Sequence, residues 1–419
     1  MTTSTPSSPP ASAKAPLLAL DEALERLLGA VEPLPATEAE RVSTFDALGR
    51  VLTEDVHSTL DVPPCDNTSM DGYAVRVADV RSPGTVLPVS QRIPAGVVGA
   101  ALAAGTAARI FTGAQLPAGA DAVVMQEQCT AVDTGVRIDA VPEPAQWIRR
   151  RGEDVLRGDV VLGRGTRLTP QGLGLAASVG AAALTVMRRP RVALFSTGDE
   201  LVMPGEPLRP GAIYNSNRYT LRGLLQALGC EVTDLGIVPD RLDATRDALR
   251  RAAAGHDLIL TSGGVSVGEE DHLRPAVRAE GRLELWQIAI KPGKPLAFGR
   301  VARAEGGAWF VGLPGNPVSS FVTFVLAVRP LLLRLQGALE LAPRHLTLRA
   351  DFDWPRPDRR REFLRARIGP AGALELFPNQ SSGVLTSTVW ADGLVDNPPG
   401  QSIAHGDAVR FLPFAELLQ

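Results

Sequence analysis

The sequence predicts a multidomain α/β protein, in which a mainly parallel α/β sandwich domain is combined with an inserted β-rich domain and a C-terminal small β-barrel domain. Three observations predict this fold. The chain of 419 residues is longer than the roughly 150–200 residues that one core usually serves. Between residues 189 and 336, strand-like apolar segments alternate with helix-like segments that end at glycine, as in the βαβ units of a parallel sheet. Residues 81–144 and 337–419 show short alternating runs broken by proline and glycine, which are typical of small β domains.

Changes in composition predict the domain boundaries. Residues 1–16 consist mainly of Ser, Thr, Pro and Ala, which is typical of a disordered tail, and they lack the apolar core of a secretory signal. Residues 17–31 have the apolar spacing of an amphipathic helix. The expected domains are an N-terminal helix and extended connecting domain over 17–61 and 151–188, an inserted β-rich domain over 62–150, a ligand-binding α/β domain over 189–336 and a C-terminal β domain over 337–419.

The α/β domain is expected to contain strands over 191–196, 231–238, 258–260 and 309–313, and helices over 217–228 and 244–254. A further helix is expected over 169–179, where Gly172 and Gly174 superficially match a dinucleotide-binding fingerprint. The match fails because the segment follows a helix start, Thr169-Pro170, instead of a strand. A P-loop is also excluded, because Gly293-Lys294 is followed by proline instead of Ser or Thr.

Polar and small residues follow the carboxyl end of each predicted strand. They are Thr197 to Glu200, Asp240, Thr261 to Gly264 with Glu269 to His272, and Pro314 to Ser320. Ligands of open α/β sheets bind beyond these strand ends, so the residues predict one site. Asn316 is expected to cap a helix whose first residue is Pro317. The alternative for residues 261–272 is a glycine turn followed by a solvated helix start, where acids favour the helix dipole.

Composition excludes several classes of protein. A net charge of −3 gives no general attraction to nucleic acid or to an anionic membrane. The three cysteines form no C-x-x-C pair, which fits a reducing cytoplasm. No segment is expected to span a bilayer, because the apolar residues 321–328 are stopped by Arg329-Pro330.

Lysine is rare in this chain. Of 43 basic residues only three are lysines, and two of these, Lys291 and Lys294, lie in the segment AIKPGKPLAFG. Lysine is a compact point charge, which a tight oxyanion pocket can require, whereas arginine is a planar fork. The alternative is chance survival of two lysines in an arginine-rich composition.

Seven segments resemble the MoeA-type molybdopterin molybdenumtransferases of molybdenum cofactor biosynthesis, a family that includes the E domain of gephyrin. The segments are VPPCDNTSMDGYAVR, RIFTGAQLPAGADAVVMQE, IRRRGEDV, RVALFSTGDEL, TSGGVSVGEED, AIKPGKPLAFG and GLPGNPVSS. They run from residue 62 to residue 320, and the resemblance is looser in the C-terminal domain. There, RPDRRREFLRARI is typical of a solvated surface but could also attract an anion.

The resemblance implies a reaction in which molybdate is inserted into adenylylated molybdopterin. Mg²⁺-dependent cleavage of the phosphoanhydride then releases AMP and molybdenum cofactor. The implied catalytic residues are Asp71, Thr112, Glu200, Asp271, Lys291 and Lys294. The implied substrate-binding residues are Asp66, Asn67, Asp154, Thr197, Gly198, Ser262, Gly263, Gly264, Ser266, Pro314, Asn316, Pro317 and Ser382. The implied metal-positioning residues are Glu200, Asp240 and Asp271, which suit the preference of Mg²⁺ for one or two carboxylates plus phosphate oxygens.

The resemblance also implies partners. A cytoplasmic homodimer is expected, in which Asp71 and Thr112 of one subunit reach Glu200 and Asp271 of the other. Transient contacts with a separate molybdopterin adenylyltransferase and with molybdoenzyme chaperones are expected, with no nucleic acid or membrane partner.

Two other functions remain as alternatives. A molybdopterin adenylyltransferase would share the Gly-Gly-Val-Ser loop at 263–266, but it would not need residues 62–150. A non-catalytic scaffold of the gephyrin type could lose Asp71, Glu200, Asp271 and the lysines without penalty, yet all are present.

Overall fold

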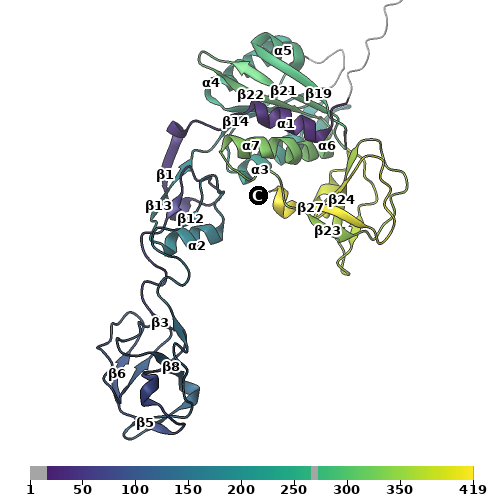
Figure 1. Ribbon diagram of the computed structural model, residues 1–419. Coiled ribbons are helices and arrows are strands. Elements are labelled where there is room, and N and C mark those ends of the chain that lie inside the picture. The colour runs from purple at the N-terminus through teal and green to yellow at the C-terminus, as the bar shows by residue number, and fades with distance from the viewer. Residues whose placement is uncertain (1–16, 266–271, 419) are drawn as a thin grey trace, which may run out of the picture.

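The computed structural model describes residues 17–265 and 272–418. Figure 1 shows a bent, elongated molecule, in which the α/β domain leads through a slender connecting domain to the β-rich domain. The C-terminal domain lies on the other side of the α/β domain. The prediction of a multidomain α/β fold is confirmed.

A six-stranded sheet forms the centre of the α/β domain, in the order β17-β14-β18-β22-β21-β19. The parallel strands are β17 (Glu231–Val238), β14 (Arg191–Thr197), β18 (Leu258–Ser262) and β22 (Gly307–Leu313). The antiparallel strands are β21 (Pro295–Ala302) and β19 (Gly281–Gln287). Burial of the residues in β14, β18 and β22 explains why these strands are continuous apolar runs in the sequence.

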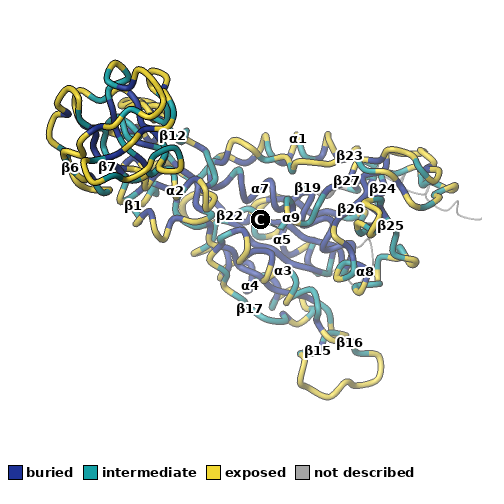
Figure 2. Tube along the Cα trace, turned by 90° about the horizontal axis from the view of Figure 1, so that it is seen from below, coloured by how far each residue is buried: buried dark blue, intermediate teal, exposed yellow. Residues whose placement is uncertain are grey.

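Helices cover both faces of this sheet. The larger core packs α1 (Leu20–Ala30), α3 (Ser216–Ala227), α6 (Pro317–Thr323) and α7 (Arg329–Leu335) on one face. The smaller core packs α4 (Leu242–Gly255) and α5 (Leu273–Glu280) on the other face. In Figure 2 the central strands are dark blue between the helical layers, whereas the edge strand β17 is mostly intermediate in burial, so the centre of the sheet is the buried middle layer.

One prediction about a helix is wrong. Arg329-Pro330 does not stop the apolar segment, because α6 continues through a π-helical turn, Phe324–Val328, into α7. In that turn the Arg329 N–H donates to the carbonyl of Phe324, five residues earlier. The wider turn gives the Pro330 ring room where a normal turn would clash. The whole helix, Pro317–Leu335, has the length and hydropathy of a membrane span, but 94% of its apolar window is buried inside the protein. It is therefore a core helix of the α/β domain.

The connecting domain consists of two chain segments. Its strand pairs are β1 (Ala39–Ser43) with β13 (Ala183–Met187) and β2 (Val56–His57) with β12 (Val160–Leu162), beside α2 (Pro170–Ser178). The hydroxyl of Thr169 caps α2 by accepting from the Gly172 N–H at 3.2 Å. Arg188 anchors this domain to the sheet by donating to both carboxylate oxygens of Asp257, at 2.7 and 2.9 Å.

The β-rich domain begins and ends at one narrow neck. The Val62 N–H donates to the carbonyl of Val155 at 2.8 Å, and the Asp154 N–H donates to the carbonyl of Val62 at 2.9 Å. Beyond the neck, β11 (Ile148–Arg149) pairs with β3 (Asn67–Thr68). A four-stranded sheet follows the order β6 (Val89–Ile93), β7 (Ala107–Ile110), β4 (Gly72–Val75), β8 (Ala122–Met125). A second sheet contains β5 (Thr85–Leu87), β10 (Gly135–Ile138) and β9 (Cys129–Val132).

The C-terminal domain is joined to the α/β domain by a shared sheet. The short strand β20 (Ile290–Lys291), which precedes β21, pairs with β24 (Arg361–Ile368). From β24 the strand order continues through β26 (Gly393–Asn397) and β27 (Ala408–Pro413) to β23 (Leu346–Arg349), and β25 (Leu374–Leu376) also pairs with β24. The domain also contains two short helices, α8 (Thr386–Trp390) and α9 (Phe414–Leu417). Directly after β23, Ala350 forms a single bridge with Leu374 of β25, where the Asp351 N–H donates to the Leu374 carbonyl at 2.8 Å. Closure into a complete barrel stays a prediction.

Candidate active site at the carboxyl ends of the parallel strands

A cavity of about 1050 Å³ lies at the carboxyl ends of the parallel strands. The C-terminal domain closes one side of it with Arg360 and the segment 380–383. Many of the residues that sequence analysis assigned to the site line this cavity. They are Thr197, Gly198, Glu200, Asp240, Ser262, Gly263, Gly264, Lys291, Lys294, Pro314, Asn316, Pro317 and Ser382. Figure 2 shows the exposed loop between β15 (Leu201–Val202) and β16 (Ile213–Tyr214) projecting from the molecule next to these residues.

The glycines after β18 form a close-fitting loop. Gly263 and Gly264 have φ angles of +89° and +64°, which residues with a side chain rarely adopt. A Cβ atom on Gly263 would lie 2.7 Å from the carbonyl oxygen of Thr197, and one on Gly264 would lie 2.8 Å from the Thr197 hydroxyl. The loop therefore requires glycine at both positions in order to pack against the end of β14.

Two buried polar atoms in the cavity wall have no partner among the described residues. They are the hydroxyl of Thr197 and the amide nitrogen of Asn215, whose side-chain oxygen accepts from the Arg218 N–H at 3.2 Å and caps α3. A buried polar group without a hydrogen bond is costly, so both atoms fit contacts to a polar ligand. Asn215 was not assigned by sequence analysis, which began the helix at residue 217. Its position as a cap directly before a helix was the available signal.

Two carboxylates that suit a metal line the same cavity, those of Glu200 and Asp240. The Glu200 side chain folds back over Gly198, where a Cβ atom would lie 2.5 Å from its Oε2. Mg²⁺ needs only one or two carboxylates when substrate phosphates supply the other ligands, so this donor set fits the ion. No group of three metal-ligating side chains occurs within residues 17–265 and 272–418. The predicted residues Ser266 and Asp271 lie outside the described residues.

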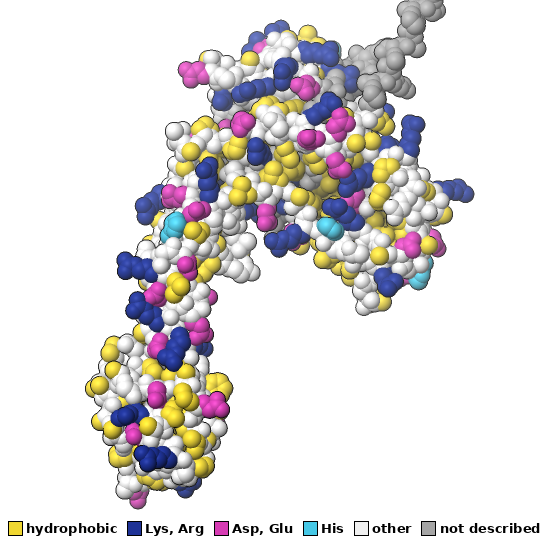
Figure 3. All heavy atoms as spheres, viewed as in Figure 1, with side chains coloured by type: hydrophobic (Ala, Val, Ile, Leu, Met, Phe, Trp, Pro, Cys, Tyr) yellow, Lys and Arg dark blue, Asp and Glu magenta, His cyan; other side chains and the backbone are white. Residues whose placement is uncertain are grey.

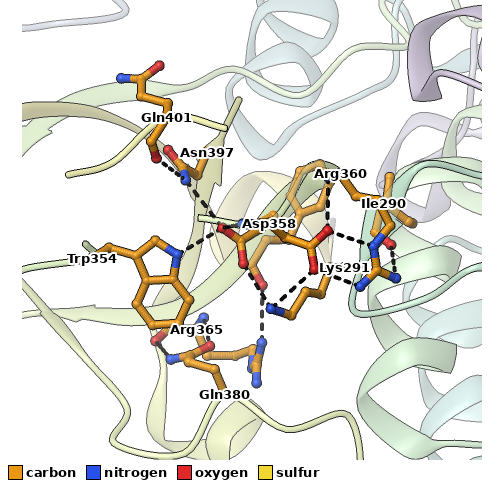
Figure 4. A network of polar contacts seen from close by, with 11 residues as sticks. Ile290, Lys291, Trp354, Asp358, Arg360, Arg365, Gln380, Asn397 and Gln401 are labelled. Atoms are coloured by element: carbon orange, nitrogen blue, oxygen red, sulfur yellow. Dashed lines mark hydrogen bonds and ion pairs between the residues drawn. The ribbon is translucent and has the colours of Figure 1, made fainter. Parts of the chain in front are cut away.

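The two lysines differ in their surroundings, and Figure 4 shows those of Lys291. The Lys291 ammonium lies 3.1 Å from the fully buried carboxylate of Glu362 and 3.5 Å from that of Asp358. The Lys294 side chain is exposed in the cavity and forms no ion pair with any described side chain. Lys294 therefore carries positive charge that an anion can use, whereas the charge of Lys291 is already shared with two carboxylates.

Arg360 is a cavity residue that sequence analysis did not single out. Its guanidinium donates to both carboxylate oxygens of Asp358, at 3.0 and 2.9 Å. These hydrogen bonds, together with the Coulomb attraction of Arg360 and Lys291, hold the pKa of Asp358 well below its usual range. The available signal was the basic segment RPDRRREFLRARI, which sequence analysis described as a solvated surface or an anion-attracting segment.

A buried arginine supports the segment 380–383 of the cavity wall. Arg365 has no exposed surface, and its guanidinium donates to the Ser387 hydroxyl at 3.1 Å and to the Ser381 carbonyl at 3.3 Å. The side chain of Gln380 bonds to both the N–H and the carbonyl of Arg365, at 2.8 and 2.9 Å. Burial lowers the pKa of Arg365 to about 10. This network fixes the backbone that carries Ser382.

Five predicted site residues lie in the distant part of the chain and do not line the cavity of the same chain: Asp66, Asn67, Asp71, Thr112 and Asp154. Asp71 Oδ1 accepts from the Thr112 N–H at 2.8 Å and from its hydroxyl at 2.7 Å, and these bonds lower the pKa of Asp71. Asp66 accepts from the Arg150 guanidinium at 2.6 Å and from the Arg151 N–H at 2.9 Å. Asp71 and Asp66 are thus ionised carboxylates that are held in place by their neighbours.

The expected cap at Asn316 is only half correct. Asn316 precedes α6, which begins at Pro317, but its side chain makes no capping hydrogen bond. The carbonyl of the preceding Gly315 accepts from the Asn217 side chain at 2.8 Å. That bond connects the first turn of α3 to the loop before α6 in the cavity wall.

Comparisons with known proteins agree with this fold along the whole chain. The MoeA N-terminal region (domain I and II) matches residues 18–180, a probable molybdopterin binding domain matches 193–334, and the MoeA C-terminal region (domain IV) matches 347–414. The molybdopterin molybdenumtransferase of Haemophilus influenzae is 40% identical over 96% of this chain and all of that protein. Molybdopterin molybdenumtransferase 2 of Mycobacterium tuberculosis is 38% identical over 88% of this chain and 93% of that protein.

Solved structures are also similar. A crystal structure of the MoeA protein of Pyrococcus horikoshii superimposes with a TM-score of 0.80 at 28% identity, covering 95% of this chain and all of that one. Fold and cavity define the class as a multidomain α/β enzyme with a polar site at the carboxyl ends of its parallel strands. The chain belongs to the molybdopterin molybdenumtransferase family.

Proposed function

We propose that this enzyme inserts molybdate into adenylylated molybdopterin and cleaves the phosphoanhydride with Mg²⁺, releasing AMP and molybdenum cofactor. The observation that carries the proposal is the cavity itself, in which a glycine loop, two carboxylates and the free Lys294 ammonium converge. These are the groups that a phosphate, a divalent cation and an oxyanion require. The relatives named molybdopterin molybdenumtransferase support the same reaction.

The residues have separate roles in this proposal. The Gly264 N–H and the orphaned Thr197 hydroxyl bind the pterin phosphate, whereas the neighbouring Gly263 N–H already donates to the Leu313 carbonyl at 3.1 Å. Lys294 binds the molybdate oxyanion, and the Arg360 guanidinium, which lines the same cavity, is a second positive group. Glu200 and Asp240, together with Asp271, position Mg²⁺, which neutralises the charge that develops on the phosphates. The substrate supplies both sulfurs for the metal, so no reactive cysteine is required.

The proposed active site is shared between two subunits of a homodimer. Asp71 and Thr112 are held in the β-rich domain, separated from the cavity of their own chain by the connecting domain. A C₂ partner would place them opposite a second cavity, in which Glu200 and Asp240 lie. We also propose transient contacts with a separate molybdopterin adenylyltransferase and with molybdoenzyme chaperones, in the cytoplasm. Figure 3 shows acidic and basic side chains mixed along the visible face, which offers no single-sign surface for nucleic acid.

A direct assay tests the reaction. Purified enzyme receives adenylylated molybdopterin, molybdate and Mg²⁺, and AMP release is measured. Lys294→Ala should reduce turnover at limiting molybdate, whereas Arg282→Ala, an exposed change on β19, should not. Absence of AMP release from the native enzyme under all these conditions would refute the proposed reaction.

Mixed dimers test the shared site. Asp71→Ala and Asp271→Ala homodimers should each be inactive, and refolding the two variants together should restore activity, because mixed dimers contain one intact site. Background AMP release from mixed dimers verified by mass spectrometry would show that both residues act within one chain.

A further inference from the structure

A second positively charged hollow lies outside the proposed active site, between α2 of the connecting domain, α7 of the α/β domain and α9 of the C-terminal domain. Its volume is about 490 Å³, and Arg167, Arg329 and Arg344 line it together with Glu340 and Glu416. None of these residues lines the cavity at the strand ends. The hollow is therefore a separate feature, to which neither the sequence motifs nor the proposed reaction assigns a role.

Two arginines in this hollow lack the partners that buried arginines normally have. Arg329 is only 8% exposed, and its Nε–H has no hydrogen-bond partner among the described residues. Its guanidinium donates to the carbonyl of Leu341, at 3.1 Å. Within residues 17–265 and 272–418, the buried Nε–H of Arg167 likewise has no partner, and the Arg167 guanidinium donates to the carbonyl of Ala227 at 3.4 Å. Neither guanidinium forms an ion pair with a carboxylate in the described part of the chain.

The electrostatics of this arrangement are unfavourable without a counter-ion. Burial is the largest cause that lowers the pKa of both Arg167 and Arg329, and for Arg329 the charge of Arg167 lowers it further. Glu416 opposes this effect without contacting Arg329 closely enough to form an ion pair. Burying a charge that is not paired and hydrogen-bonded destabilises the folded protein. A bound anion would remove this cost.

The helix α2 adds a third positive group. Its capping residue Thr169 and its third residue, Gly172, both line the hollow, so the N-terminus of this nine-residue helix faces the same space. Helix N-termini favour anions because the helix dipole is positive there. In α2 the attraction comes from this dipole, since Pro170 has no N–H and the Gly172 N–H is donated to Thr169. Two unpartnered guanidinium Nε–H groups and one helix N-terminus therefore converge on one hollow.

We propose that this hollow binds a small oxyanion, a phosphate or a carboxylate, between Arg329 and Arg167. The two arginines belong to different domains, Arg167 to the loop that precedes α2 and Arg329 to α7. A bound anion would bridge them and tie the connecting domain to the α/β domain. The anion is thus a ligand that fixes the position of the β-rich arm relative to the sheet.

Calorimetric titration of the full-length enzyme with inorganic phosphate, at constant ionic strength set with chloride, tests this proposal. The strand-end cavity also attracts phosphate, so two variants separate the sites. Arg329→Met and Arg167→Met should each weaken one saturable phosphate-binding event by about tenfold to a hundredfold, which is the effect of losing one hydrogen bond to a charged group. Lys294→Met should leave that event intact. Arg167→Met keeps the test valid if Arg329→Met fails to fold, because Arg167 lies in a loop and is less buried.

Three results would overturn the proposal. Phosphate binding that is lost in Lys294→Met and kept in both arginine variants would place the only phosphate site at the strand ends. No saturable phosphate binding beyond the chloride control would show that the hollow does not take this oxyanion. An enzyme that is dimeric in native form but monomeric in both arginine variants, with unchanged phosphate binding, would identify the anion as an acidic side chain of a second copy.

Discussion

Lys291 and Glu362 are expected to have a large coupling free energy in a double-mutant cycle. Glu362 is fully buried, and besides Lys291 its carboxylate accepts from the Trp354 indole N–H at 2.8 Å and from the Asp358 N–H at 3.0 Å. Glu362→Gln keeps the shape of this side chain but removes its charge. If the amide oxygen stays with the indole, the amide NH₂ group faces the Lys291 ammonium, because the two carboxylate oxygens of Glu362 accept separately from Trp354 and Lys291.

The magnitude follows from the hydrogen bond that is lost. A hydrogen bond to a charged group contributes about 1.5–3 kcal/mol, and Lys291, which is 39% exposed, can turn toward solvent and limit the loss. We expect Glu362→Gln to lower the free energy of unfolding by about 2 kcal/mol, or the Tm by about 4–8 °C. In a double-mutant cycle with Lys291→Met, the coupling energy should be about 1.5–3 kcal/mol, measured by urea unfolding.

A matched control is the exposed pair Arg26 and Glu22, whose atoms approach to 2.6 Å on the surface of α1. Its coupling should be only about 0.3–0.5 kcal/mol, as for other exposed pairs in helices. A Lys291–Glu362 coupling below about 0.5 kcal/mol, which is the usual error of additivity, would refute the reasoning. Lys291 would then be as available to a ligand as Lys294.

Further outcomes concern other parts of the chain. Arg365→Met should raise the KM for molybdate with little change in the circular dichroism spectrum, because it releases the carbonyl of Ser381 and the hydroxyl of Ser387; an unchanged KM would contradict a positioning role. Lys294→Arg should raise the molybdate concentration needed for half-maximal turnover, and an unchanged dependence would favour chance survival of this lysine. Iodoacetamide at pH 8 should leave Cys129 and Cys230 unmodified in the native enzyme, because burial raises their pKa values to about 11 and about 12; rapid labelling of either, read by mass spectrometry, would contradict this. The pKa of Asp358 is lowered in the folded enzyme, so its ion pairs contribute their full stability above its ordinary pKa of 3.8 and lose it as the pH falls further. Asp358→Asn should therefore flatten the loss of Tm below pH 4, and an acid dependence identical to that of the native enzyme would show that Asp358 does not cause it.

Local patterns in the sequence were sufficient for most elements of the α/β domain. The strand expected over 231–238 is β17 (Glu231–Val238), and the helix expected over 169–179 is α2 with Thr169 as its cap. Both follow from short-range rules of apolar spacing, capping and glycine termination. Thr197, Ser262 and Asp240 follow or end predicted parallel strands. Because the carboxyl ends of parallel strands lie at the same edge of a sheet, the sequence predicted that these residues lie together.

Features that depend on distant contacts could not be predicted in this way. The sequence gives no sign that Lys291 meets Glu362, because the two residues are 71 positions apart and belong to different domains. Arg360 enters the cavity only because β20 pairs with β24, which extends the C-terminal sheet to the cavity. The prediction that the helix ends at Arg329-Pro330 is wrong for a different reason. A π-helical turn relieves the clash that normally ends a helix at proline.

The narrow neck at Val62 and Val155 makes the β-rich domain separable from the rest of the protein. Both ends of the domain leave the neck as adjacent, hydrogen-bonded backbones. A two-residue hairpin turn such as Asn-Gly could therefore replace residues 63–154 without moving either end. In evolution, the β-rich domain can therefore be inserted, deleted or exchanged as one unit. The core of the α/β domain, with its sheet and strand-end cavity, stays unchanged.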